Sequence, residues 1–307
     1  MAGPVNKDAT SPPVEQNIGL GILLMVLAAG LSTGLSASAK WLLTEIAMPL
    51  FQVVALRYAV HFTMAVVLFV PRHGPGVFRS NAPGQLLLRS MFLVMATILN
   101  FLALKFLPLT LTTTIMFAGP IVINVLAVPM LGERIGGHRI VAVIAGFIGV
   151  LVVVQPGSAA FQPAALFSVG AVIAASLYYI MTRKLAGVDS NASIQLWSSG
   201  LATLCFLPFS IPVWIWPDAT VGYLVVVSMG LFGALSHIAS TAAHRVAEAS
   251  ILAPFSYAQI ITATVVGVTV FGEQLDMVTY VGCGVIVMSG IYIWWREGKG
   301  TTAHSNH

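Results

Sequence analysis

The sequence ALKFLPLTLTTTIMFAGPIVINVLAVPMLGE, residues 103–133, decides the fold because a related stretch returns 140 residues later. The second stretch is AHRVAEASILAPFSYAQIITATVVGVTVFGE, residues 243–273. Each has a cation near its start, a long apolar segment that contains proline, and a Gly-Glu pair at its end. Few interior residues match and the prolines are not equivalent, so the repeat indicates an old internal duplication.

The composition indicates that lipid is the solvent of this chain. Of its 307 residues, 58% are hydrophobic and only 8% are charged, and the mean hydropathy is +0.93. Soluble globular domains are roughly one quarter charged. A chain with so few charges does not cover a water-soluble surface of this size, which predicts an integral membrane protein.

The sequence lacks the motifs of several other protein classes. The pI is about 9.2, but the fourteen Lys and Arg residues are scattered, so we expect no nucleic-acid partner. The two cysteines, Cys205 and Cys283, lie inside apolar runs and have no metal-ligand spacing. No phosphate-binding loop, zinc-protease motif or nucleophile elbow occurs. We therefore expect no catalytic residue, no metal and no cofactor.

Apolar length predicts an all-α protein of ten transmembrane helices, since a bilayer core of ~30 Å needs about 20 apolar residues per helix. The expected spans are 18–41, 49–70, 86–106, 109–130, 138–155, 164–184, 191–214, 220–242, 249–271 and 277–295. The first repeat then covers residues 18–157 and the second covers 164–295. We expect a disordered cytoplasmic tail at 1–17 and a cytoplasmic tail at 296–307.

The basic residues predict the orientation. With the N-terminus in the cytoplasm, eleven Lys and Arg residues lie on the cytoplasmic side and two lie outside. Both termini are then cytoplasmic, and the second five-helix half enters the membrane inverted relative to the first. Inverted repeats are typical of secondary transporters. Small-residue patterns such as Gly30-x-x-x-Gly34 predict close helix packing inside the bundle, and a homodimer is the alternative.

A family resemblance rests on motifs that follow one another along nearly the whole chain. They are LKFLPL at 104–109, FAGP at 117–120, LGER at 131–134, GFIGV at 146–150, QPG at 155–157, LAPFSYAQ at 252–259, FGE at 271–273 and SGIY at 289–292. Together they resemble the EamA-type transporters of the drug/metabolite transporter superfamily. The segment around residues 254–259 is similar to the subgroup that includes riboflavin and S-adenosylmethionine uptake proteins.

The resemblance implies two inverted five-helix halves, a bacterial inner-membrane location and alternating access around a central cavity. It also implies that helices five and ten lie away from the cavity, which suits the Gly-rich spans 138–155 and 277–295. The Gly-Glu turns that end the two repeated stretches are interpreted as structural caps and charge pairs.

Charged and titratable residues inside the spans are the first candidate site residues. Arg57 lies near the middle of its span, and no carboxylate occupies the middle of any span. Since buried charge is costly in lipid, a negative group of the substrate is expected to pair with Arg57; the alternative is that Arg57 caps backbone carbonyls. His61 shares the helix face of Arg57 and is a further substrate-binding candidate. His61 and His237 are candidates for proton coupling, or else hydrogen-bonded core residues.

Further candidates are helix-breaking, polar and aromatic residues. Pro120 and Pro254 are expected to break helices and free carbonyls that line a cavity, or simply to kink them. Polar substrate-binding candidates are Asn100, Asn124 and Gln259, and aromatic candidates are Phe117, Trp197 and Tyr257. Core packing is the alternative for each.

The sequence therefore predicts a secondary transporter of a small organic metabolite, with riboflavin or a similar vitamin as the first candidate for uptake. An amino-acid, amine or drug exporter of the same family is the alternative. A membrane-embedded enzyme acting on lipid-linked substrates is a more remote one, because it would need acidic or histidine clusters at one leaflet, and the sequence has none.

Overall fold

The computed structural model describes residues 17–131, 137–155, 161–185, 188–246, Leu252 and 255–303, and this part of the chain contains helices and no strand. The helices are α1 (Ile18–Thr44), α2 (Leu50–His73), η1 (Pro75–Phe78), α3 (Pro83–Phe106), α4 (Leu109–Met116), α5 (Gly119–Leu131), α6 (Gly137–Val154), α7 (Ala165–Lys184), α8 (Asn191–Ser210), η2 (Ile211–Val213), α9 (Thr220–Val246), α11 (Ala258–Phe271) and α12 (Met277–Ala303). The all-α prediction is confirmed.

Six of these helices, α1, α2, α3, α7, α8 and α9, are long and apolar enough to cross a membrane. Within the described residues, the other predicted spans contain shorter apolar helical segments of 10–17 residues. The predicted span 109–130 is interrupted: α4 ends at Met116 and α5 begins at Gly119. At the chain ends, the Asn17 side chain caps α1, and α12 continues past the predicted limit of residue 295 to Ala303.

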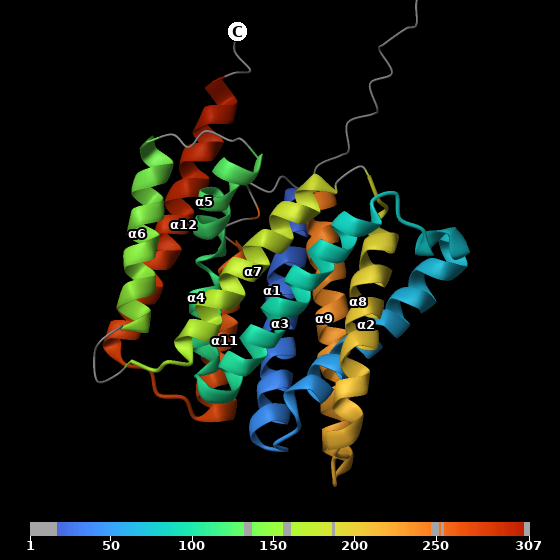
Figure 1. Ribbon diagram of the computed structural model, residues 1–307. Helices are drawn as coiled ribbons and strands as arrows, with labels where there is room; N and C mark the ends of the chain where they lie inside the picture. The colour runs from blue at the N-terminus through green and yellow to red at the C-terminus, as the bar shows by residue number, and fades with distance from the viewer. Residues whose placement is uncertain are drawn as a thin grey trace, which may run out of the picture.

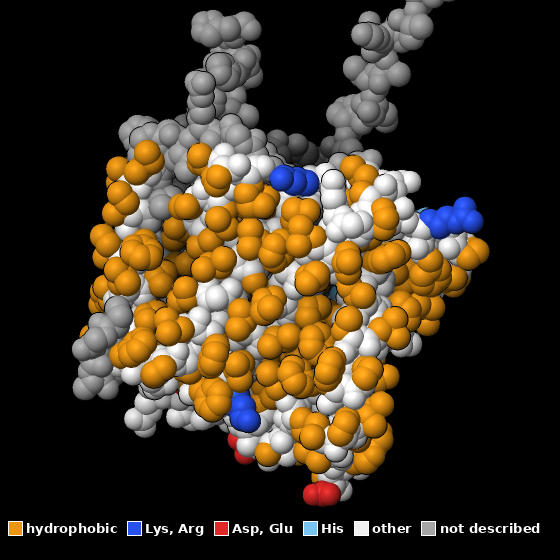
Figure 2. Space-filling model, viewed as in Figure 1, with side chains coloured by type: hydrophobic (Ala, Val, Ile, Leu, Met, Phe, Trp, Pro, Cys, Tyr) orange, Lys and Arg blue, Asp and Glu red, His pale blue; other side chains and the backbone are white. Residues whose placement is uncertain are grey.

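Hydrophobic side chains cover the side of the bundle between its two ends, as expected for a surface in contact with lipid (Figure 2). In that view the charged side chains gather toward the upper and lower ends. The start of α1 and the end of α12 lie at the same end of the bundle (Figure 1). The distribution of polar and apolar side chains is that of a multi-pass membrane protein.

Helices from the two halves of the chain pack in pairs. The most extensive contacts join α1 to α9, α2 to α8, α3 to α7, and α6 to α12. Each pair takes one helix from residues 17–155 and one from residues 161–303. Further contacts between the halves join α2 to α9, α1 to α11 and α4 to α11, so the bundle is one interleaved unit.

The pair α6–α12 forms one edge of the bundle (Figure 1). Glycine allows its close approach: a Cβ on Gly149 would lie 2.9 Å from the Ile286 side chain, and one on Gly282 would lie 3.1 Å from the Gly149 carbonyl oxygen. Gly34 packs in the same way against Phe232 of α9, whereas Gly30 has open space around it. Close packing at Gly34, as the sequence predicted, and also at Gly149 and Gly282 therefore occurs within the chain.

Candidate functional site

Arg57 lies in the interior of the bundle, on the face of α2 that meets α3. It is 8% exposed, and its Nη1 donates a hydrogen bond to Oγ1 of Thr97 at 2.9 Å. Its guanidinium carbon lies 5.0 Å from the Tyr58 ring centre and 5.3 Å from that of Phe101, which provides cation–π stabilisation. A guanidinium carries five N–H donors. The described residues accept from one of them, and the buried Nε has no partner.

Thr97 links Arg57 to its neighbours on α2 and α3. The Thr97 hydroxyl donates to the Leu93 carbonyl and shares a 2.7 Å hydrogen bond with the Tyr58 hydroxyl. Its lone pairs therefore serve both Arg57 and Tyr58. No carboxylate takes part, so the positive charge of Arg57 is not neutralised by these contacts.

The two histidines predicted as coupling residues meet between α2 and α9. The rings of His61 and His237 are stacked, with centroids 5.9 Å apart and an angle of 23° between the ring planes. His61 lies one helical turn after Arg57. Sequence spacing placed His61 near Arg57, whereas the contact with His237 follows from the packing of α2 on α9.

Two pairs of hydroxyl groups join α1 to helices of the second half. Ser32 shares a 2.6 Å hydrogen bond with Ser236 of α9, and Thr33 shares one of 2.6 Å with Thr262 of α11. Thr33 also donates to the Gln259 carbonyl at 3.5 Å. Serine and threonine inside apolar spans commonly join membrane helices. Ser and Thr residues inside apolar spans could thus be recognised in the sequence, but the sequence does not show which residues on other helices they bond to.

Two aromatic rings meet at the helix breaks of the two halves. Phe117 lies between α4 and α5, and Tyr257 directly precedes α11. Their ring centroids are 5.1 Å apart and the ring planes are inclined by 34°. The positions differ by 140 residues, the offset of the sequence repeat. The pair thus joins equivalent positions of the two halves.

The remaining candidates lie in several places. Trp197 donates from Nε1 to the Phe78 carbonyl at 2.9 Å and packs beside Leu86 and Leu185, away from the aromatic pair. Asn100 is half-buried on α3, one turn beyond the Arg57–Thr97 contact. Pro120 is the second residue of α5, just after the break, a position where proline is tolerated. Pro254 and the side chain of Asn124 lie outside the described residues.

Arg89, one of the eleven Lys and Arg residues counted on the cytoplasmic side in the predicted topology, is a buried arginine. Because α3 begins at Pro83, Arg89 lies inside the helix and is only 3% exposed. Its Nε donates to Thr182 at 2.7 Å, Nη1 to Ser198 at 2.8 Å and Nη2 to the Tyr178 hydroxyl at 2.8 Å. Every guanidinium nitrogen has a partner, in contrast to Arg57. Arg89 therefore joins α3, α7 and α8.

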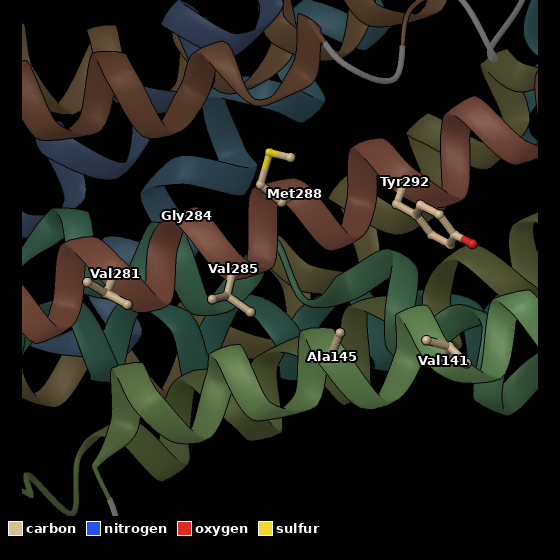
Figure 3. A pocket seen from close by; sticks show the side chains of 7 residues that line it. All are labelled: Val141, Ala145, Val281, Gly284, Val285, Met288 and Tyr292. Carbon is tan, nitrogen blue, oxygen red and sulfur yellow. The ribbon is translucent and has the colours of Figure 1, made fainter.

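A groove along the edge of the bundle has an apolar lining, unlike the polar sites described above. It holds about 510 Å³ and is lined by residues of α6 and α12, namely Val141, Ala145, Val281, Gly284, Val285, Met288 and Tyr292. Figure 3 shows that this lining is apolar apart from the Tyr292 hydroxyl. Such a lining offers nothing to orient a polar metabolite. The interior groups around Arg57 and the aromatic pair are the better candidate site.

Comparison with known proteins identifies the family. The model of the EamA-like transporter family matches this chain twice, over residues 19–155 and 162–295. The chain belongs to this family. It is a membrane transporter of the drug/metabolite superfamily and not an enzyme.

Relatives of this EamA-like protein carry different names. It is 28% identical to a riboflavin transporter of Vibrio cholerae, over 92% of this chain and 96% of that one. It is 27% identical to an S-adenosylmethionine uptake transporter of Rickettsia prowazekii, over 81% and 84%. A pseudopaline exporter of Pseudomonas aeruginosa is 23% identical, over 91% and 97%. A solved crystal structure shares the fold with a TM-score of 0.59 at 21% identity, over 89% of this chain and 94% of the other.

Proposed function

We propose that this EamA-like protein takes up riboflavin or a similar vitamin across the bacterial inner membrane by alternating access. In this proposal ten helices form two inverted five-helix halves, which rock about a central site. Both termini are cytoplasmic. Two observations support cytoplasmic termini. The helix α1 begins and α12 ends at one end of the bundle, and α2 and α7 end toward the same end (Figure 1). The basic residues Arg72 and Lys184 lie in the last turns of α2 and α7, and Arg79 follows η1.

The contact between Phe117 and Tyr257 is the observation that carries the substrate proposal. A flat ring system gains stacking energy from aromatic side chains on either side, about 0.5–1.5 kcal/mol per pair beyond burial. Phe117 and Tyr257 come from opposite halves and from the helix breaks of each, so a flat ring that enters by separating the two side chains would contact both moving parts. Riboflavin transporters among the relatives support the same choice.

Arg57 favours a second candidate substrate, one with a carboxylate. Four of its five N–H donors have no acceptor among the described residues, and the side chain is buried. A carboxylate accepts two parallel hydrogen bonds from a guanidinium. S-adenosylmethionine, the substrate named for several relatives, carries such a group. An amino-acid or amine exporter would use the same contact.

The stacked His61 and His237 pair supports proton coupling. Histidine is the side chain whose charge changes most readily near neutral pH. The pair lies between helices of the two halves, where a change of its charge would alter their packing. Exchanging both residues for Gln should remove accumulation driven by a pH gradient and leave solute exchange intact. Accumulation at the wild-type level in that variant would exclude proton coupling through this pair.

Uptake by cells tests the substrate proposal. Cells that cannot make riboflavin and lack other uptake routes are given this gene, and entry of labelled riboflavin and growth on limiting riboflavin are measured. We expect both to exceed the empty-vector control. Growth and uptake equal to that control, with the protein present in the membrane, would contradict riboflavin as substrate. Labelled S-adenosylmethionine in the same cells tests the second candidate.

A further inference from the structure

Lys40 and Glu273 form an ion pair where α1 ends, α4 begins and α11 ends. Nζ of Lys40 lies 2.5 Å from Oε1 of Glu273, and the two side chains are 11% and 5% exposed. Lys40 also donates to the Leu107 carbonyl at 3.0 Å and lies 4.9 Å from the Phe271 ring centre. The pair is shielded from water, so its attraction is stronger than that of a surface pair.

The Glu273 carboxylate also binds the N-terminus of α4. Oε1 accepts a hydrogen bond from the backbone N–H of Leu109. Oε2 accepts from the Thr110 N–H and from its hydroxyl, each at 3.3 Å. A carboxylate at this position satisfies unpaired N–H groups and interacts favourably with the helix dipole. Glu273 therefore neutralises Lys40 and caps α4 at once.

The turn before Glu273 positions the Glu273 carboxylate. Gly272 has a φ of +61°, in the left-handed region that favours glycine, and the Glu273 N–H donates to the Gly267 carbonyl at 2.9 Å. At Gly267 a Cβ would collide with the Glu273 carboxylate and lie 2.9 Å from the Thr110 hydroxyl. Glycine at position 267 leaves the space that the Glu273 side chain occupies.

These contacts join the two halves. Lys40 and α4 belong to the first matched repeat, and Glu273 belongs to the second. Thr110 and Leu109 are fully buried beside the carboxylate, and the Thr110 hydroxyl reaches the Ala263 carbonyl of α11 at 3.4 Å. The end of α11 is thereby held against α1 and α4.

We propose that Lys40, Glu273 and the first turn of α4 form the gate that closes the solute path at this face of the transporter. The inference rests on the proposed alternating access, in which the halves separate at one face while they meet at the other. Opening of this face must pull Glu273 from Lys40 and from the α4 N-terminus. A clamp that is only structural would stay closed throughout transport.

Covalent closure tests the gate. In a variant with Cys205→Ser and Cys283→Ser, Lys40→Cys and Glu273→Cys are joined by a short bifunctional methanethiosulfonate in purified protein, which is then placed in liposomes. We expect loss of solute exchange on cross-linking and recovery after reduction. Exchange at the uncross-linked rate in the joined protein would overturn the proposal.

A second cross-link at the same face is the matched control. The Gln155 amide donates to the Asp276 carboxylate at 3.0 Å, joining the end of α6 to the start of α12. Because α6 and α12 pack as a fixed edge in this proposal, Gln155→Cys joined to Asp276→Cys should leave exchange unchanged. If this control cross-link abolished exchange as fully as the gate cross-link, the gate would have no special role and the proposal would fail.

A labelling experiment that does not measure transport tests the gate independently of the proposed substrate. Ala263 is fully buried on α11 behind the ion pair. In the same cysteine-free background, the rate at which a membrane-impermeant maleimide labels Ala263→Cys is compared with and without Glu273→Gln or Lys40→Met. We expect at least about a tenfold faster rate in both, because loss of one partner leaves a buried charge unpaired. Unchanged labelling would overturn the gate even if riboflavin uptake is found.

Discussion

The rings of Phe117 and Tyr257 touch across the two halves of the chain, with their centroids 5.1 Å apart, although 140 residues separate them in the sequence. Both side chains are half-buried and lie where a helix is interrupted or begins. Equivalent positions of a duplicated unit therefore meet at one point. A solute bound there contacts both halves, which is what rocking of the halves about a bound solute requires.

Removing either ring should weaken solute binding. For Phe117→Leu and Tyr257→Leu we expect the concentration for half-maximal transport to rise about 5- to 10-fold, as the loss of roughly 1–1.5 kcal/mol of stacking implies. The matched control is Phe209→Leu, since Phe209 is exposed on the side of the bundle. The measurement is uptake as a function of solute concentration. Equal half-maximal concentrations for all three variants would contradict a role of the two rings in binding.

The unused donors of Arg57 lead to a prediction on transport. Arg57→Ala should abolish transport with the protein still inserted, and Arg57→Lys should restore only part, because an ammonium lacks the planar pair of donors. Arg79→Ala, at an exposed position after η1, is the control and should transport normally. Uptake normalised to the amount of protein in the membrane is the measurement. Full activity of Arg57→Ala would remove Arg57 from the proposed site.

Arg89 should affect stability instead. Arg89→Ala leaves the hydroxyls of Thr182, Ser198 and Tyr178 without their donor. Thr182 keeps its bond to the Tyr178 carbonyl and Ser198 keeps its bond to Ser90. The loss of a hydrogen bond to a charged group still costs roughly 1.5–3 kcal/mol. We expect a lower melting temperature in detergent and a largely unchanged half-maximal concentration in whatever protein inserts. A variant with wild-type melting temperature and a raised half-maximal concentration would indicate that Arg89 binds solute.

The α6–α12 edge should tolerate larger residues at one glycine and not at another. Gly149→Leu has no space beside Ile286 and Val285, and overpacking of this kind typically costs about 1–3 kcal/mol. Gly284→Leu points into open space within the groove and should be nearly neutral. Thermal unfolding of the two variants provides the comparison. Equal destabilisation would show that the glycine contacts do not stabilise this edge.

Much of the helical framework was predictable because apolar length is a strong signal in a membrane protein. The break at Phe117–Ala118 was only indicated by the nearby Pro120, since span length alone cannot distinguish one helix from two short ones. That no carboxylate among the described residues pairs with Arg57 was also expected, because no carboxylate occurs in the middle of any predicted span.

Contacts between distant helices were not predictable. The three partners of Arg89 lie on α7 and α8, 89 to 109 residues away. Their hydroxyl groups are common in apolar spans, so nothing in the sequence marks them as partners. The same holds for Glu273, which was interpreted as a structural cap, because its lysine and its capped helix lie in the other half of the chain. Trp197 was grouped with the interior aromatics, yet it bonds to the Phe78 carbonyl.

Solute counterflow in liposomes tests the central claim most directly. Purified protein is reconstituted into liposomes loaded with unlabelled riboflavin, with S-adenosylmethionine, amino acids and amines loaded in parallel, and entry of the labelled solute is followed. Alternating access predicts transient, saturable accumulation of label that depends on solute inside and disappears in Arg57→Ala. Absence of counterflow for every solute, or entry that rises linearly with concentration as through a pore, would contradict the account.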